Sequence, residues 1–243
     1  MAQVAMFPLS TVLMPHMPLT VRIFEERYQR MLGALLEAEP PAEPHFGVVL
    51  IERGHESGGN DRRFSLGTMA RIERVVSAGP GDFVIFAHGT HRVNVLSWDE
   101  EAPYPRARVS EIAELPWSPT LEPLRAEAER VVRRVLTRAS EFADVGWDPA
   151  IELSDGPVAS SWQLAGIAPI PDIDRMGLLQ SASLAELLTG VIALTRDAEP
   201  ALTSARADSE FADAVAQLLR ETEADTEPDS GERGDPEDDS DRE

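Results

Sequence analysis

The spacing of apolar residues changes near position 117, and this change constrains the fold more than any other feature of the sequence. In residues 1–117 apolar and polar positions alternate, as Ala70 and Ile72 do with the charged residues that follow them. Such alternation predicts strands with one buried face. In residues 118–220 apolar positions recur every three or four residues, which predicts amphipathic helices. The sequence therefore predicts an α+β fold, in which a strand-rich N-terminal domain packs against a C-terminal helical subdomain.

The N-terminal domain is expected to hold many short strands joined by turns. The apolar run 45–51 predicts a strand that is covered on both faces, and residues 19–22 predict another. Turn residues at 79–82 predict a hairpin between a strand containing Val76 and one that begins at Phe83. Many short strands with Gly and Pro turns favour a closed or nearly closed barrel.

Three finer expectations concern the backbone of this domain. Residues 12–14 form an apolar run before Pro15 and are expected to be a strand. The alternation slips after Ser110, where a β-bulge would explain the change of phase. Gly67 and Gly89 are expected to serve backbone geometry or the close approach of neighbouring strands.

One helix is expected among the strands and several more after residue 118. Phe24 and Tyr28 fall on the apolar face of the first helix, so both are expected in the core. Asp172 is expected to cap a later helix, and residues 183–186 form a capping box for the next one. The apolar positions that define the C-terminal helices are Leu121, Leu124, Ala128, Val131, Val135, Trp162, Leu164, Ile167, Met176, Leu179, Leu184, Leu188, Phe211, Val215 and Leu218.

The charge of the chain is strongly negative, at −21. Residues 221–243 hold twelve acidic residues, two arginines and no large apolar side chain, so they are expected to be a disordered acidic tail. An acidic chain repels nucleic acid. No apolar run approaches the roughly 20 residues of a membrane span, and the N-terminus does not resemble a secretory signal. We therefore expect a cytoplasmic protein with no nucleic-acid or membrane partner.

Two residue types are missing, which excludes several chemistries. All 22 basic residues are arginine, and cysteine is absent. Without lysine there is no P-loop, Schiff base or Ser–Lys dyad, and without cysteine no thiol nucleophile or zinc knuckle. His88 and His91 have no carboxylate in the six residues that follow, and no Gly-x-Ser-x-Gly elbow occurs. We expect no metal, no cofactor and no catalytic residue, and interpret the chain as a binding module.

Four short segments occur in a fixed order along the chain. Each is a weak signal by itself, but the ordered set is specific for one family. They are IFEERY at 23–28, GTMARI at 67–72, GTHRV at 89–93 and the strand after Pro103-Tyr104. In this order they resemble the substrate-binding (N-terminal) domain of Lon proteases, with its "IFE-x-RY", "GT-x-A-x-I", "G-x-x-R-F/V" and "PY-x-A-x-V" segments. The resemblance covers about residues 5–115 strongly and the helical subdomain more weakly.

The resemblance implies a PUA-like β pseudo-barrel, packed against helices, that binds polypeptide. A full Lon protease continues into an ATPase and a Ser–Lys peptidase, and this lysine-free chain can be neither. We therefore expect a non-enzymatic substrate-recognition module that acts as an adaptor or holdase for client proteins. The expected partners are unfolded or peptide-like protein segments, together with an ATP-dependent protease or chaperone. An extended peptide would pair with an edge strand of the incomplete barrel.

The residues predicted to contact such a peptide are Glu25, Arg27, Arg30, Arg92 and Tyr104. Arginine offers a planar set of donors to carboxylates and carbonyls. Structural roles are the alternatives: an ion pair for Arg27, a bond to a loop carbonyl for Arg92, and stacking on Trp98 or Trp117 for Tyr104. Two other functions stay open, a small-molecule or RNA binder on the same barrel and a cryptic hydrolase.

Overall fold

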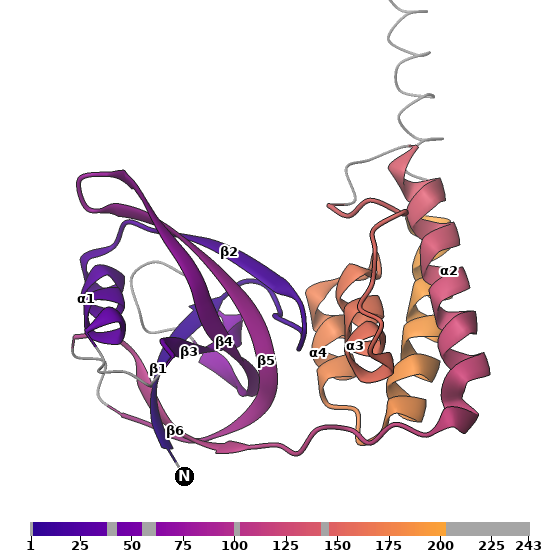
Figure 1. Cartoon of the computed structure of the whole chain (residues 1–243), viewed down its shortest axis with the longest axis horizontal. Coiled ribbons are helices and arrows are strands. Elements are labelled where there is room, and N and C mark those ends of the chain that lie inside the picture. The colour runs from indigo at the N-terminus through magenta and orange to yellow at the C-terminus, as the bar shows by residue number, and fades with distance from the viewer. Residues whose placement is uncertain (1, 38–42, 55–61, 100–102, 142–145, 203–243) are drawn as a thin grey trace, which may run out of the picture.

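Strands occupy the first part of the chain and helices the second (Figure 1). The last strand ends at Glu111, and the first helical turn after it begins at Pro119. The predicted α+β architecture is therefore confirmed. The helix predicted from Phe211 onward and the tail 221–243 lie outside the described residues. The computed structural model describes residues 2–37, 43–54, 62–99, 103–141 and 146–202.

Six strands form one sheet that closes on itself. Their order is β2-β5-β4-β3-β1-β6, and a further pairing of β5 with β6 closes five of them into a ring. Of the strands in the described part of the chain, β2 alone stands outside the ring, where it pairs with β5. β1 and β3 are parallel and the other pairs antiparallel. The strands are β1 (Ala2–Leu9), β2 (Pro18–Ile23), β3 (His45–Arg53), β4 (Arg62–Gly79), β5 (Asp82–Trp98) and β6 (Arg106–Glu111).

Apolar side chains fill the ring and also cover its outside. A smaller core cluster draws side chains from all five strands of the ring, so it occupies the barrel interior. A Cβ on Gly47 would lie 2.5 Å from the sulfur of Met6 in this interior. A larger cluster joins the outer surface of the ring to the helices. The interior cluster consists of Val4, Met6, Val49, Met69, Val93, Ala107 and Val109.

Most of the predicted strand features are confirmed. Residues 19–22 lie within β2 and 45–51 within β3, and the turn at 79–82 joins the long hairpin of β4 and β5. The close approach expected at two glycines is also found. A Cβ on Gly67 would lie 2.2 Å from the carbonyl oxygen of Val48, and one on Gly89 would lie 2.5 Å from that of Met14.

The strand predicted at residues 12–14 is wrong. These residues lie in the connection from β1 to β2, where side chains rather than a neighbouring strand satisfy the backbone. The hydroxyl of Thr68 donates to the carbonyl oxygen of Leu13 at 2.6 Å, and the carboxylate of Asp172 accepts from the N–H of Val12 at 2.9 Å. The prediction that Asp172 caps its own helix is therefore wrong, because its carboxylate holds this connection instead.

The bulge predicted after Ser110 is also wrong in position. The register between β5 and β6 shifts between Val95 and Ser97, on the opposite strand. Ile112 lies beyond the end of β6, and its N–H donates to the carbonyl oxygen of Arg92 at 2.9 Å. Its change of phase reflects the end of the strand.

Helix α1 (Glu26–Leu36) lies against the barrel on the side away from the other helices (Figure 1). Tyr28 is buried, and the centroid of its ring lies 4.2 Å from the centroid of the Phe7 ring. Phe24 is 62% exposed, so its predicted place in the core is wrong. The reason is the helix start: α1 begins at Glu26, and Phe24 precedes it outside the helical periodicity.

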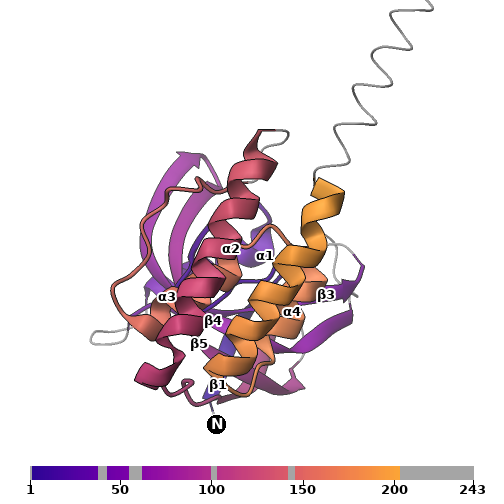
Figure 2. The same ribbon diagram turned by 90° about the vertical axis from the view of Figure 1, so that its right-hand side faces the viewer.

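The C-terminal helices form two layers beside the barrel. α3 and α4 lie next to the barrel, while α2 and the helical residues 184–202 lie outside them (Figures 1 and 2). The Ser183 half of the predicted capping box is confirmed, because its hydroxyl accepts from the N–H of Glu186 at 3.1 Å. The carboxylate of Glu186 instead accepts from the N–H of Ala182. The elements are η1 (Pro119–Leu121), α2 (Glu122–Ser140), α3 (Pro157–Ile167) and α4 (Asp172–Leu179).

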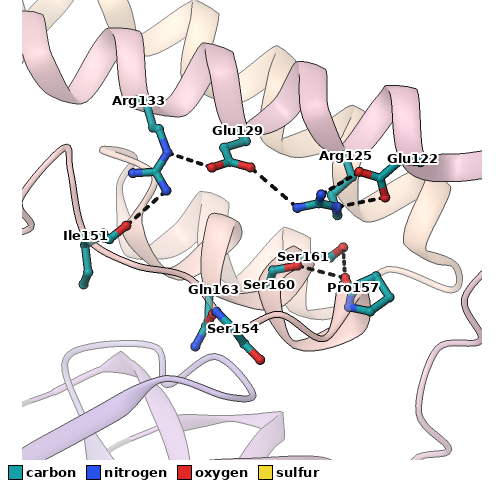
Figure 3. Close-up of polar contacts among 10 residues, drawn as sticks. All are labelled: Glu122, Arg125, Glu129, Arg133, Ile151, Ser154, Pro157, Ser160, Ser161 and Gln163. Atoms are coloured by element: carbon teal, nitrogen blue, oxygen red, sulfur yellow. Dashed lines mark hydrogen bonds and ion pairs between the residues drawn. The ribbon is translucent and has the colours of Figure 1, made fainter.

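A charged ladder along α2 fixes the segment that precedes α3 (Figure 3). Glu122, Arg125, Glu129 and Arg133 are linked in sequence by ion pairs. Arg133 then donates to the carbonyl oxygen of Ile151 at 3.0 Å, which ties the loop to the helix. The arginines of this face serve the fold, because each has a carboxylate or carbonyl partner.

Candidate functional site

The junction between barrel and helices is built around Arg92. This β5 residue is 5% exposed, and its Nη1 donates to the carbonyl oxygens of Leu179 at 2.9 Å and Ser181 at 2.8 Å. Its guanidinium also lies 5.0 Å from the ring centroid of Trp162. Burial lowers the pKa of Arg92, and the charge of Glu114 opposes that shift. These bonds agree with the structural alternative for Arg92, a tie from a barrel strand to loop carbonyls.

A second link crosses the same junction. Trp162 on α3 donates its indole N–H to Glu114 Oε1 at 3.0 Å, and Glu114 Oε2 lies 3.4 Å from His16 Nε2. The side chain of Gln163 donates to the carbonyl oxygen of His16 at 3.2 Å. A cavity of about 580 Å³ remains here, and Arg92 and Glu114 are among the residues that line it. Polar bonds therefore link the barrel to the helices around this cavity, which Leu66, Ile112 and Leu115 also line.

A groove of about 370 Å³ lies elsewhere, between β1, β2 and the start of α1. β2 has β5 as its only strand neighbour among the described residues. β6 pairs with β1 from Ala2 to Ala5, and the carbonyl oxygen of Pro105 accepts from the N–H of Met6 at 2.9 Å. Within the described residues, β3 is the only strand paired with residues 7–9 of β1. The groove therefore runs between two strand edges, and we call it the edge groove. Its lining residues are Phe7, Pro8, Leu9, Thr11, Leu19, Thr20, Val21, Arg22, Phe24, Glu25 and Tyr28.

The edge groove continues toward the helices. A second hollow of about 150 Å³ shares Thr11 and Leu19 with it and reaches Trp147 and Arg175. The two hollows together follow the length of β2. A strand of six residues spans about 20 Å, so an extended segment of similar length matches this path.

The walls of the edge groove are mainly apolar, with charged groups at its rim. Phe24 is the most exposed of its aromatic side chains. Arg22 donates from Nε to Asp82 Oδ1 at 2.9 Å, and this contact lowers the pKa of the Asp82 carboxyl. Glu25 accepts from Arg27 Nε at 3.1 Å. An apolar side chain would find contact area here, with a carboxylate close by.

The predicted contact residues are only partly brought together. Glu25 lines the edge groove, and Arg27 lies beside it with its guanidinium 4.5 Å from the ring centroid of Tyr28. The ion pair of Arg27 with Glu25 agrees with the structural alternative for that residue. Arg30 faces solvent and pairs with Glu26 on the outer side of α1.

The remaining two predicted residues lie apart from the groove. Arg92 is at the junction described above. Tyr104 is half-buried, with the guanidinium of Arg106 5.8 Å from its ring centroid. Within the part of the chain that the structure describes, its ring is not found stacked on Trp98 or Trp117.

Sequence reasoning missed Phe24 as an exposed groove residue and missed the wall supplied by β1. The signal for Phe24 was present, because Glu25 and Glu26 favour a helix start after it. The wall of β1 depends on where β6 stops pairing, which no local pattern encodes.

No metal centre or membrane helix is found in the described residues. Among them, no group of three or more His, Asp or Glu side chains is arranged to hold a metal ion. No described helix is both long and apolar enough to cross a membrane. His88 is partly buried, and burial lowers its pKa. His91 lies at a different place, the mouth of the barrel.

Comparison with known sequences finds two curated Lon proteases. The chain is 23% identical over 216 residues to Lon protease of Koribacter versatilis, covering 87% of this chain and 26% of that protein. It is 30% identical over 137 residues to Lon protease 2 of Sorangium cellulosum, covering 54% of this chain and 15% of that protein. The chain therefore spans about a quarter or less of the length of these relatives.

Solved structures share the fold. The Lon N-terminal domain protein from Xanthomonas campestris aligns with a TM-score of 0.56 at 23% identity, covering 79% of this chain and 98% of that one. The N-terminal domain of Lon protease from the Mycobacterium avium complex gives a TM-score of 0.57 at 17% identity, with coverage of 81% and 99%.

Residues 3–197 match the family described as the ATP-dependent protease La (LON) substrate-binding domain. The match extends from β1 through the barrel and into the last described helix. This chain therefore belongs to the Lon substrate-binding domain family.

Proposed function

We propose that this protein binds extended polypeptide segments of client proteins without cutting them, and that the edge groove receives them. The observation that carries the proposal is an edge strand, β2, beside an apolar groove in a member of a substrate-binding family. A peptide added to β2 would gain main-chain hydrogen bonds that do not depend on its sequence. Such binding suits a module that must accept many unfolded clients.

The groove walls would supply preference among client segments. Successive side chains of an extended peptide point to opposite sides, so every second one can face the groove. Phe24, Leu19 and Val21 offer apolar contact to those side chains. Bulky apolar residues, which unfolded chains display and folded ones bury, are the expected anchors.

Charge would add a second preference. The net charge of −21 and the carboxylate of Glu25 favour client segments with basic residues next to the apolar anchor. The same charge disfavours nucleic acid. Of the predicted contact residues, Glu25 and Arg27 remain proposed contacts at the groove. Arg30, Arg92 and Tyr104 do not line the groove.

The role in the cell is proposed on the same basis. A module that grips clients and neither hydrolyses ATP nor cuts peptides acts as an adaptor or holdase. Its proposed partner is an ATP-dependent protease or chaperone that receives the bound client, in the cytoplasm.

The test compares two exposed apolar residues. Phe24 lines the edge groove and is 62% exposed, whereas Ile173 on α4 is 61% exposed and lines none of the hollows described above. Fluorescence anisotropy would follow a labelled denatured model protein on wild type, Phe24→Asp and Ile173→Asp. Weaker binding by Phe24→Asp alone supports the proposal. Equal binding by all three chains, or no binding by wild type at tens of micromolar, contradicts it.

A further inference from the structure

One end of the barrel is open to solvent, and we call this opening the barrel mouth. A cavity of about 560 Å³ lies there, lined by residues of β1, β3, β4, β5 and β6 and by Glu43, which precedes β3. It shares no lining residue with the edge groove. Small-molecule sites in proteins commonly have volumes of about 300–1,000 Å³. The cavity is therefore large enough for a small ligand or one terminal residue of a chain.

The floor of the mouth is apolar. Val4, Met69, Val93 and Val109 line it, and all four belong to the core cluster inside the ring. They are buried and come from β1, β4, β5 and β6, so the floor is held by packing among four strands. A ligand that reaches this floor must present an apolar group.

The rim of the mouth is charged, with the guanidinium of Arg71 against the carboxylates of Glu43 and Glu111. Arg71 lies 3.4 Å from Glu43 and 3.8 Å from Glu73, so its charge is already offset. Glu111 faces His91 at 3.8 Å, and its side chain is 81% exposed. Among the rim residues, the carboxylates of Glu43 and Glu111 outnumber the single guanidinium of Arg71. An entering head group is therefore favoured if it is a cation.

We propose that the barrel mouth binds an apolar group that carries an ammonium charge. The apolar part rests on Val93 and Val109, and the ammonium lies at the rim near Glu111. Two sources supply this chemistry, a free amphipathic amine and the N-terminal ammonium of a polypeptide with an apolar first residue. This site goes beyond the proposed function, because it is separate from the edge groove.

The chemistry of the ligand is tested with three matched probes. Phenylpropylamine, phenylpropanol and phenylpropionate share an apolar body and differ in the charge of the head group. Calorimetric titration of the full chain is expected to show the amine binding most tightly and the carboxylate most weakly. Binding of phenylpropionate as tight as that of the amine would overturn the charge assignment, and absence of binding by all three would overturn the site.

The place of binding is tested with a pair of neighbouring substitutions on β1. Ala2 is exposed and lines the mouth, whereas Gln3 is exposed, faces the other way and donates to Asp99. Ala2→Trp is expected to fill the mouth and abolish binding of the amine, and Gln3→Trp to leave it unchanged. Equal effects of the two variants would overturn the assignment. Circular dichroism checks that both chains fold.

A third variant tests the carboxylate itself. Glu111→Gln is expected to weaken amine binding about two- to fivefold, the range for an exposed ion pair, and to leave phenylpropanol binding unchanged. Loss of affinity for both probes alike would contradict the proposed place of the ammonium. Phe24→Asp, which alters the edge groove, is expected to leave amine binding intact, so failure of either site is distinguishable from failure of the other.

Two peptides separate the possible sources. Both begin with phenylalanine, and only one has a free amino group. Binding of the free peptide but not the acetylated one, with loss in Ala2→Trp, supports polypeptide N-termini as the ligand. Binding of phenylpropylamine without either peptide supports a free amine. Equal binding of both peptides at the mouth would overturn the need for an ammonium.

Discussion

The barrel meets its surroundings in two opposite ways. At the junction with the helices, buried polar groups are paired, and Arg92, Glu114 and Trp162 link the two halves. At the edge groove, β2 has no second strand neighbour among the residues that the structure describes, and Phe24 is left exposed. At the junction the named polar side chains bond to one another around a cavity of about 580 Å³, whereas the groove offers an edge strand and an exposed apolar side chain. This difference is the reason why we propose the barrel edge, rather than the junction, as the place where clients bind.

The bonds across the junction between barrel and helices can be tested by replacing Arg92. Replacement by Ala leaves the buried carbonyl oxygens of Leu179 and Ser181 without their donor. We expect a loss of about 2–4 kcal/mol in the free energy of unfolding, because an unsatisfied buried acceptor costs about 1–3 kcal/mol. Urea denaturation measures it. Arg108→Ala, at an exposed position on β6, is the control and should change stability little. Similar losses of stability in both variants would show that the hydrogen bonds of Arg92 do not stabilise the junction.

The close packing of strands in the barrel wall can be tested at Gly67. A Cβ there would lie 2.2 Å from the carbonyl oxygen of Val48, which is backbone and cannot move aside alone. Gly67→Ala is expected to lower the free energy of unfolding by about 1–3 kcal/mol, the usual cost of overpacking. Thermal unfolding of the variant checks this. A stability equal to wild type would mean that the strands are further apart than described.

A glycine-to-alanine replacement in α1, the helix beside the groove, is expected to change stability in the opposite direction. Gly33 lies in α1, with nothing within 4 Å of a Cβ built on it. Gly33→Ala is therefore expected to raise the free energy of unfolding by about 0.5–1 kcal/mol, from helix propensity alone. The same denaturation series serves as the measurement. If Gly33→Ala and Gly67→Ala destabilised equally, the contrast between open and packed positions would fail.

The smallest expected effect is a pH dependence at the groove rim. Arg22 holds the pKa of Asp82 below its usual value, so the ionised carboxylate stabilises the folded state above about pH 4. This contribution is lost as the pH falls through the folded-state pKa. Between pH 5 and 3 the melting temperature of Asp82→Asn should fall less than that of wild type. Parallel curves for the two chains would contradict a role for this pair.

Local patterns in the sequence were enough for the elements with strong periodicity. The buried run of β3, the hairpin of β4 and β5 and the amphipathic α2 each have a signal within a short window. The apolar run 12–14 was misassigned because its partners, Thr68 and Asp172, lie far away in the sequence. Phe24 was misplaced by a helix start two residues later than expected.

The candidate site was less predictable than the fold. Glu25 and Arg27 stay predictions; they lie at the edge groove because both belong to the segment at the helix start. The role of Arg92 depends on carbonyls about ninety positions away. The groove itself exists because β6 stops pairing with β1 at Ala5, a consequence of register across the whole sheet. Such features follow from tertiary pairing, which no single window contains.

Hydrogen exchange of backbone amides, with and without a bound client peptide, tests the central claim most directly. Pairing with the edge strand predicts slower exchange in β2 (Pro18–Ile23) and at the start of α1, with no change at Leu179 or Ser181 at the junction. Protection that appears at the junction while β2 exchanges as before would contradict the account.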